Sequence, residues 1–521
     1  MSLVVVHTLI LAAARAPAGE STDAVEQWGT FELVLRADNF KGNGFTEVRF
    51  DGAFESDGVT ILAHGFYDGD HTYRLRFMPD RKGAWTYRTT SNLPELDGRT
   101  GQFTCVAPGP TNRGPVSVRN VYHFAYADGS PFVPIGTTSY GWVHQPAELQ
   151  ERTLATLKTS PFNKVRMSIF PSRSRPKAEK PLLPFPLSAD GSVDRTRFDP
   201  AFFRNLETRM TQLADLGIEA DLILFHPYDD GRFGLDQMEP EVDDRYARYV
   251  VARLAAYRNV WWSMANEFDL LNEKSDADWA RLIALVQSED PYGHLRSIHH
   301  SQRMYDPSSS ALTHLSVQNG LAVSDFGRAV QFRNLVHKPI VFDEVHYEGN
   351  ASRRWGQLSG EEMTLRFWMG TIAGTYVGHG EAIAREGRPA WLSAGGELVG
   401  TSPSRIAFLK SILRDAPPEG IEPIDPYYET HVAGKPGEYY LIYFGREKPT
   451  EWTFDLPRFE LRDGMQFKVD VIDTWNMNVE PLESLFTIAK HSDYIFRAQS
   501  AAPVRLPGRP YMAVRVRRVA Q

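Results

Sequence analysis

Cysteine is almost absent from this sequence, and positive charge is not in excess. Cys105 is the single cysteine in 521 residues, which excludes an internal disulfide and a cysteine-based zinc site. The formal net charge is −8, because 57 Lys and Arg residues stand against 65 Asp and Glu residues. Proteins that bind nucleic acid are typically basic. We therefore expect no nucleic-acid partner, and a neutral, hydroxyl-rich ligand fits this charge balance better than a polyanion.

Long apolar runs are missing as well. No stretch of about 18 apolar residues occurs, so we expect no membrane span. Residues 3–14 form a shorter apolar run followed by A-x-A-like residues, which resembles a secretory signal without its positively charged start. A short strand is the alternative. On balance, residues 1–20 favour a secreted or periplasmic location slightly over a cytoplasmic one.

Two stretches of alternating apolar and polar residues flank the middle of the chain. In residues 24–108, Tyr73, Leu75 and Phe77 share one face of a predicted strand, and turn clusters such as "YDGD" separate such strands. Residues 420–521 alternate in the same way in "EYYLIYFG" and "YMAVRVRRV". Short strands at intervals of about 8–12 residues are typical of β-sandwiches. We predict one β-sandwich in each stretch, with a structural or oligomerising role, so a homo-oligomer is compatible with the sequence.

Residues 116–415 alternate between strands and helices. A clear helix is predicted over residues 199–217, where Asp199 can cap the start, Pro200 occupies the first turn and Gly217 can end it. Apolar strands follow one another from "FVPIGTTSY" to "TYVGHGE". About eight such strands, with helices between most of them, predict a parallel (β/α)8 TIM barrel. A doubly wound sheet is the alternative, but no Gly-rich phosphate loop follows the first strand.

Polar residues gather at the carboxyl ends of the predicted strands, where barrel enzymes place their chemistry. Glu267 ends the apolar run "WWSMANE", and Glu344 ends "PIVFDE". Both carboxylates should therefore lie at the ends of buried strands and face the same mouth of the barrel. Two carboxyl groups that face each other can cleave a glycosidic bond, one as proton donor and the other as nucleophile or charge stabiliser. Burial and the charge of the partner would raise the pKa of the acid.

The Asn266–Glu267 pair on the fourth predicted strand, with Glu344 on the seventh, resembles the pattern of clan A glycoside hydrolases. The resemblance implies that Glu267 is the general acid/base and Glu344 the nucleophile of a retaining enzyme. It also implies that Asn266 binds the sugar 2-hydroxyl. Arg166, at the end of the second predicted strand, matches the arginine that keeps the nucleophile ionised in that clan.

A closer resemblance covers residue 24 to the C-terminus. The stretches "GFYDGDHTYRLRFMPD", "FDEVHYEGN", "GGELVGTSPSRIAFLK" and "VDVIDTWNM" are similar to a bacterial family of three-part glycosidases related to glycoside hydrolase family 5. This family implies an N-terminal β domain of unknown function at 24–108, a catalytic barrel at 116–415 and a C-terminal β domain at 420–521. Two positions depart from the wider pattern. Phe268 stands where many clan members carry Pro, and Gln318 ends the sixth strand where family 5 enzymes often carry His-x-Tyr.

The other strand-end residues form the predicted sugar-binding set. Long segments at 171–191 and 346–360 suggest a closed pocket, and thus an exo-acting enzyme on short saccharides. Neither His-x-His nor His-Glu-x-x-His spacing occurs, so no metal or cofactor is expected. A non-catalytic sugar-binding protein on the same barrel and a metal-dependent hydrolase are the alternatives. The predicted substrate contacts are Trp142, Arg166, His226, Asn266, His300, Gln318, Tyr347, His379, Glu381 and Trp391.

Overall fold

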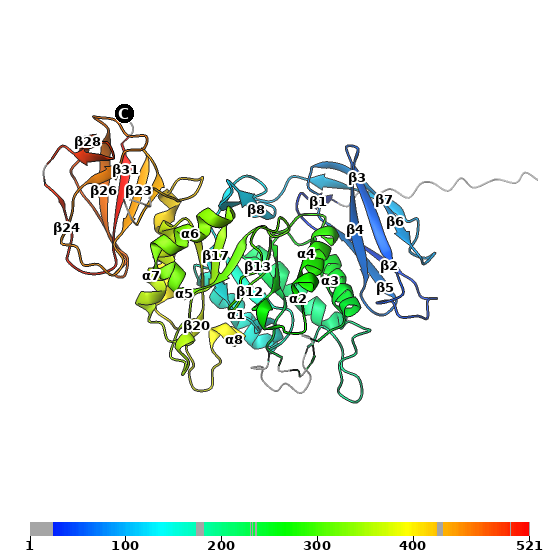
Figure 1. Ribbon diagram of the computed structural model, residues 1–521. Helices are drawn as coiled ribbons and strands as arrows, with labels where there is room; N and C mark the ends of the chain where they lie inside the picture. Colours follow the sequence, from blue (N-terminus) through cyan, green and yellow to red (C-terminus); the bar gives the residue numbers. More distant parts are fainter. Residues whose placement is uncertain are drawn as a thin grey trace, which may run out of the picture.

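The computed structural model describes residues 24–172, 182–229, 231, 233–234, 237–424, 431–500 and 502–519. The signal-like segment at residues 1–20 lies outside this part of the chain, as does a stretch of the predicted loop at 171–191. The molecule consists of three parts in a row, with helices and strands mixed in the central one and strands in the outer two (Figure 1).

Seven strands form the N-terminal part: β1 (Ala24–Glu26), β2 (Phe31–Arg36), β3 (Phe50–Ser56), β4 (Val59–Tyr67), β5 (Thr72–Phe77), β6 (Gly83–Ser91) and β7 (Thr100–Val106). Their spatial order is β1-β7-β6-β3-β4-β5-β2. One end of β4 pairs with β3 and the other end pairs with β5, so the sheet folds over into two layers. Ring centroids of Phe31 and Phe103, from opposite layers, lie 4.4 Å apart, and those of Phe54 and Phe77 lie 4.0 Å apart. The alternating residues thus enclose an aromatic core.

Eight parallel strands form the centre of the middle part: β11 (Gly136–Thr138), β12 (Lys164–Ser168), β13 (Glu219–Phe225), β14 (Val260–Ala265), β15 (Arg296–Ser297), β16 (Leu315–Gln318), β17 (Ile340–Glu344) and β19 (Tyr376–His379). They pair in the order β15-β14-β13-β12-β11-β19-β17-β16. A parallel bridge between His299, just beyond β15, and Ser316 of β16 joins the two edges of this sheet. The strands therefore close into a ring, and β14 and β17 are its fourth and seventh strands along the chain.

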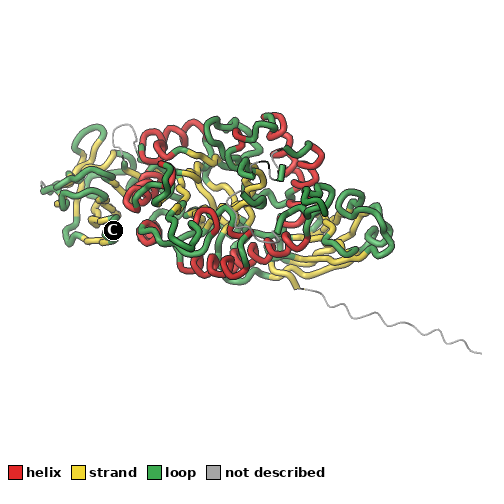
Figure 2. Tube along the Cα trace, turned by 90° about the horizontal axis from the view of Figure 1, so that it is seen from below, coloured by secondary structure: helices red, strands yellow, loops and turns green. Residues whose placement is uncertain are grey.

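Helices surround this ring (Figure 2). The helix predicted from the sequence begins and ends close to the expected residues. The Asp199 side chain accepts a hydrogen bond from the backbone N–H of Ala201, and Gly217 follows the helix with a φ of +70°. The helices are α1 (Ala147–Thr159), α2 (Pro200–Asp215), α3 (Pro240–Leu254), α4 (Asp276–Glu289), α5 (Gly320–Ser324), α6 (Phe326–Val336), α7 (Gly360–Ile372), α8 (Trp391–Ala394) and α9 (Ser402–Ile412).

A small antiparallel sheet closes the amino-terminal end of the ring. Its strands are β8 (Val116–Arg119), β9 (His123–Tyr126) and β10 (Pro131–Phe132). Phe124 and Phe132 pack against Trp261, near the start of β14, with ring centroids 5.2 Å and 5.9 Å away. Aromatic side chains therefore cover the amino-terminal end of the ring interior.

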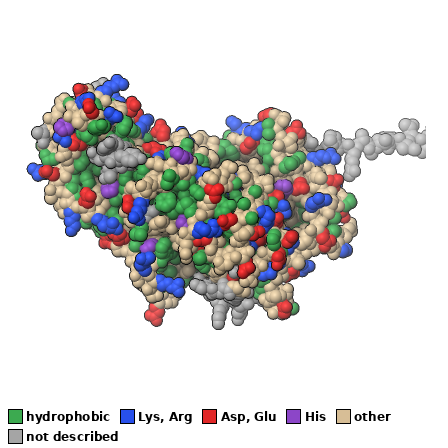
Figure 3. Space-filling view, in the orientation of Figure 1, with side chains coloured by type: hydrophobic (Ala, Val, Ile, Leu, Met, Phe, Trp, Pro, Cys, Tyr) green, Lys and Arg blue, Asp and Glu red, His purple; other side chains and the backbone are tan. Residues whose placement is uncertain are grey.

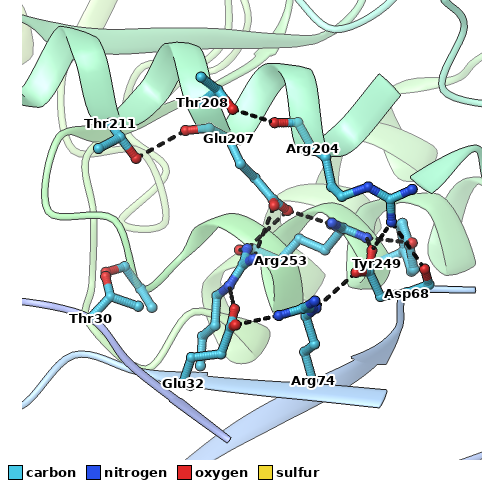
Figure 4. A network of polar contacts seen from close by, with 12 residues as sticks. Thr30, Glu32, Asp68, Arg74, Arg204, Glu207, Thr208, Thr211, Tyr249 and Arg253 are labelled. Carbon is cyan, nitrogen blue, oxygen red and sulfur yellow. Dashed lines mark hydrogen bonds and ion pairs between the residues drawn. The ribbon is translucent and has the colours of Figure 1, made fainter. Parts of the chain in front are cut away.

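A buried ionic network joins the N-terminal part to helices α2 and α3 (Figure 4). Arg253 of α3 is fully buried and donates hydrogen bonds to Glu207 of α2 at 2.5 Å and to Asp68 of the N-terminal part at 2.8 Å. Arg76 of β5 donates to Glu207 at 2.9 Å. Breaking a buried pair leaves an uncompensated charge, which is strongly destabilising. Buried ion pairs therefore hold the N-terminal part against helices α2 and α3.

The C-terminal part is built from strands, as the alternation predicts. It contains β21 (Glu422–Pro423), β22 (Val432–Lys435), β23 (Tyr439–Tyr443), β24 (Glu451–Trp452), β25 (Asp455–Pro457), β26 (Gln466–Asp473), β27 (Asn478–Pro481), β28 (Phe486–Lys490), β29 (Ile495–Ala498), β30 (Val504–Arg505) and β31 (Met512–Arg518). Phe454 stacks on Phe486 within its core, at 5.0 Å between ring centroids. Trp368 of α7 stacks on Tyr443 of β23 at 5.3 Å. This part thus packs directly on the outer helices of the ring.

The surface agrees with the charge balance of the sequence. On the face shown in Figure 3, acidic and basic side chains are interspersed. Within the described ranges, no helix has both the length and the apolar character needed to span a bilayer.

Candidate active site

A cavity of about 500 Å³ lies at the carboxyl ends of the ring strands, and both predicted catalytic carboxylates line it. This volume is within the usual range for a small-molecule site. The long segment predicted to border the pocket contributes Trp355 and Arg353 to its wall. Other residues that line the cavity are Tyr140, Ser168, Tyr228, Gln318, Tyr347 and Leu392.

Glu344 is the last residue of β17, and its side chain is almost completely buried. Its Oε1 atom lies 3.4 Å from Nη1 of Arg166, and the hydroxyl of Tyr140 donates to the same oxygen. Burial raises the pKa of Glu344. Arg166 opposes this rise, whereas the charge of Glu267 adds to it, and hydrogen bonds from Tyr140 and Tyr347 lower the pKa again. Burial thus destabilises the ionised form of Glu344, whereas Arg166 and the two tyrosines stabilise it.

Glu267 follows β14 in a left-handed backbone conformation, with a φ of +46°. Non-glycine residues adopt this conformation at a cost, and it is frequent at functional sites. The hydroxyl of Tyr228 donates to Oε2 of Glu267, and Nδ2 of Asn266 lies 3.2 Å from the same hydroxyl oxygen. Oδ1 of Asn266 is buried and has no hydrogen-bond partner among the described residues. The adjacent amide and carboxylate therefore share one phenol.

Tyr140 and Tyr228 are site residues that the sequence interpretation missed. Each follows a ring strand by two or three residues, so the same strand-end criterion could have found them. Burial, together with the neighbouring carboxylates, raises the pKa of both phenols. Both therefore stay protonated and act as hydrogen-bond donors to Glu344 and Glu267.

Trp142 and Trp391 do not reach the cavity, which corrects their predicted stacking on sugar. Both side chains are fully buried in the core. The indole N–H of Trp142 points to Sδ of Met167 at 3.0 Å, and that of Trp391 donates to Oγ1 of Thr137 at 2.9 Å. A strand-end position in the sequence does not show whether a ring lies in the core or lines the cavity.

Two predicted histidines also lie behind the cavity wall. His226 donates from Nε2 to the carbonyl oxygen of Phe170 at 2.9 Å and accepts the backbone N–H of Tyr228 at Nδ1. It thereby holds the segment that carries Tyr228, instead of contacting a ligand itself. His300 stacks beside His299 at 6.1 Å between ring centroids and does not line the cavity.

His379 and Glu381 join Glu348 in a buried cluster next to the cavity wall, and their potential ligand atoms lie within 4.8 Å of one another. This composition could hold a metal ion. However, the backbone N–H and hydroxyl groups of both Thr401 and Ser402 donate to the Glu348 carboxylate. These four donors use the lone pairs that a metal would need. The Glu381 carboxylate accepts two further backbone N–H groups, from residues 399 and 400. The cluster therefore anchors the "GGELVGTS" segment and the start of α9.

Comparisons with known proteins agree with this architecture. A family model described as "Apiosidase-like, catalytic domain" matches residues 119–380. Two models described as domains of unknown function, DUF5060 and DUF5605, match residues 24–92 and 428–517. A candidate glycoside hydrolase from Bacteroides vulgatus ATCC 8482 is 40% identical, with a TM-score of 0.92 over 95% of this chain and 100% of that chain. No curated protein matches the chain.

More distant structures share the fold. A glycoside hydrolase family 5 protein from Bacteroides vulgatus ATCC 8482 is 14% identical, with a TM-score of 0.57 over 78% of this chain and 94% of that chain. The strand ring, its cavity and these similarities define a glycoside hydrolase of three parts, with a β domain on each side of the catalytic one. The chain belongs to the family with the apiosidase-like catalytic domain, because that domain covers half of its length and the 40% identical relative spans nearly all of it.

Proposed function

We propose that the protein is a retaining, exo-acting glycosidase in which Glu267 is the general acid/base and Glu344 the nucleophile. The observation that carries the proposal is that Glu267 and Glu344, from the fourth and seventh ring strands, line one cavity. Their surroundings differ. Among the described residues, a guanidinium and two phenols contact Glu344, whereas one phenol contacts Glu267. Such a difference suits one carboxylate that works ionised and one that carries a proton.

The reaction has two displacement steps. In the first, Glu267 gives its proton to the glycosidic oxygen while a Glu344 oxygen bonds to the anomeric carbon, and the leaving alcohol departs. In the second, Glu267 takes a proton from water, the water oxygen bonds to the anomeric carbon, and the bond to Glu344 breaks. Each step inverts the anomeric centre, so the product keeps the configuration of the substrate.

The neighbouring residues receive roles within this mechanism. Arg166 and Tyr140 compensate the charge of Glu344 before and after the covalent step. Tyr228 orients Glu267, and Asn266 binds the hydroxyl at position 2 of the sugar through its unpaired Oδ1.

The substrate is a terminal sugar of a short saccharide or glycoside. The 346–360 segment supports exo action, because its residues Arg353 and Trp355 form part of the cavity wall. The family description makes apiosides the first substrates to test.

A screen of aryl glycosides, both furanosides and pyranosides, tests the proposal. Wild-type protein should hydrolyse at least one of them and retain full activity in a chelator. Loss of activity in the chelator would favour a metal-dependent hydrolase. Binding without turnover for every sugar would favour the non-catalytic sugar-binding alternative.

A further inference from the structure

His299 is a fully buried histidine beside the cavity that the proposed mechanism does not use. It lies between β15 and β16, and both ring nitrogens have close polar neighbours. Nδ1 lies 2.9 Å from Oγ of Ser316, and Nε2 lies 3.1 Å from Oε1 of Gln318. Gln318 in turn lines the cavity. The proton positions on His299 therefore decide which atom of the Gln318 amide can face a ligand.

The direction of the first hydrogen bond follows from Asp343. Its Oδ1 accepts Nζ of Lys164 at 2.8 Å. Burial opposes ionisation of Asp343, but Lys164 and Arg166 hold its pKa below the ordinary value, so the carboxylate can only accept hydrogen bonds. The Ser316 hydroxyl donates to Oδ2 of Asp343 at 2.6 Å. Having given its only proton to Asp343, Ser316 must accept from His299, and Nδ1 carries the hydrogen.

The second nitrogen then carries a lone pair. Burial first, and the positive charge of Arg166 second, keep the pKa of His299 well below its ordinary value, so the ring is neutral. A neutral ring with hydrogen on Nδ1 is an acceptor at Nε2. An oxygen of Gln318 opposite this lone pair would be repelled. A half-turn of the amide places an N–H donor there without changing its shape, and it directs Oε1 to the cavity.

We propose that Asp343, Ser316 and His299 form a hydrogen-bond relay that turns the carbonyl oxygen of Gln318 toward the substrate. Gln318 then accepts a hydrogen bond from a sugar hydroxyl, and the site discriminates against analogues that cannot donate one. Ser316 and His299 are positioning residues, because they act through Gln318. The substrate contact rests on the proposed glycosidase function, whereas the relay itself does not.

The relay has a second consequence for Glu344. Nε2 of His299 lies 3.6 Å from Oε1 of Glu344. Without a hydrogen at Nε2, His299 cannot protonate this carboxylate or pair with its charge. Compensation of the negative charge is thus left to Arg166 and the tyrosines.

Nuclear magnetic resonance of the full chain labelled with ¹⁵N-histidine tests the relay without any substrate. The His299 signals are assigned as those missing from His299→Gln. In wild-type protein at neutral pH we expect a neutral ring with hydrogen on Nδ1. Ser316→Ala removes the acceptor and should abolish this preference. Ser297→Ala is the matched control, because Ser297 is equally buried and its hydroxyl has no partner among the described residues.

Gln318→Glu provides an independent variant. A carboxylate cannot donate to Nε2, so His299 should acquire hydrogen at Nε2 in this variant. An imidazolium, or a ring with hydrogen only on Nε2, in the wild-type protein would overturn the proposal.

The substrate contact is tested with deoxyfluoro analogues of the glycoside found by the screen, since fluorine cannot donate a hydrogen bond. Fluorine at one hydroxyl position should lower kcat/KM of the wild-type protein roughly 3–10-fold more than kcat/KM of Gln318→Ala. The inductive effect of fluorine is the same for both proteins, so it cancels in this comparison. Equal losses in both proteins at every position would overturn the contact. If no glycoside is hydrolysed but the resonance result holds, the proposed function fails and the relay stands.

Discussion

Nη1 of Arg166 lies 3.4 Å from Oε1 of Glu344, and both side chains are almost completely buried. The contact places a permanent positive charge beside a carboxylate whose pKa burial raises above its ordinary value. The proposed nucleophile must be ionised, so kcat/KM should fall as the pH decreases through this raised pKa. Arg166→Met removes the opposing charge, and the acidic limb of the kcat/KM profile should move to higher pH by about one unit or more.

Arg296→Met serves as the control for this shift. Arg296 is also buried in the ring, but its guanidinium donates to backbone carbonyls of Ala311 and His294. Its loss should reduce stability without moving the acidic limb. An unshifted limb in Arg166→Met would contradict the role of Arg166.

The two carboxylates should respond differently to removal. Glu267→Ala should lower activity by roughly 10²–10⁴-fold on natural glycosides, because their leaving groups need a proton. An activated aryl leaving group departs without one, so glycosylation should then be slowed much less. Azide should rescue Glu267→Ala and give a glycosyl azide of retained configuration. Glu344→Ala should be nearly inactive on both substrates, with any azide product inverted. If Glu344→Ala were the variant rescued by azide with retained configuration, the roles of Glu267 and Glu344 would be reversed.

The stereochemical outcome is a separate prediction. Double displacement requires carboxyl groups about 5–5.5 Å apart. We expect the first-formed sugar to have the anomeric configuration of the substrate, as read by proton resonance before mutarotation. An inverted product, together with a carboxyl separation of about 6.5 Å or more in a crystal structure, would indicate single displacement instead.

Tyr228 should matter through its hydroxyl alone. Tyr228→Phe removes the donor to Glu267 and should lower kcat roughly 10–100-fold, because hydrogen bonds to charged groups are the stronger ones. Tyr246→Phe is the matched control. Tyr246 is fully buried, and its hydroxyl donates to the carbonyl oxygen of Leu224 at 3.0 Å instead of to a carboxylate. Similar kcat values for the two variants would contradict a role of the Tyr228 hydroxyl in catalysis.

The N-terminal β domain should be required for stability. Asp68→Ala removes one of the two carboxylates that Arg253 contacts and leaves the buried network with an excess positive charge, so it should lower the free energy of unfolding by about 3–5 kcal/mol. Asp70→Asn, two residues away, removes only an exposed ion pair with Arg36, because Asn also tolerates the left-handed backbone at this position, and it should cost less than about 1 kcal/mol. Denaturant unfolding measures both. A truncated protein without residues 1–108 that stayed fully active and stable would contradict this role.

Several features could be predicted from the sequence because they depend on local pattern. Apolar runs that end in Glu267 and Glu344 predict strands with carboxylates at their carboxyl ends, and both residues line the cavity. Asp199, Pro200 and Gly217 predict the limits of α2 because capping uses groups within one turn of the helix end.

Other features depend on which strands become neighbours, and only the tertiary structure decided them. Trp142 and Trp391 occupy strand-end positions like those of the site residues, yet packing against Met167 and Thr137 places both rings in the core. The His299 contacts likewise arise where β15 meets β16 and the ring closes. A strand-end position specifies the end of the barrel at which a side chain lies. Whether that side chain meets solvent or core is set by residues distant in sequence, because burial is a property of the assembled packing.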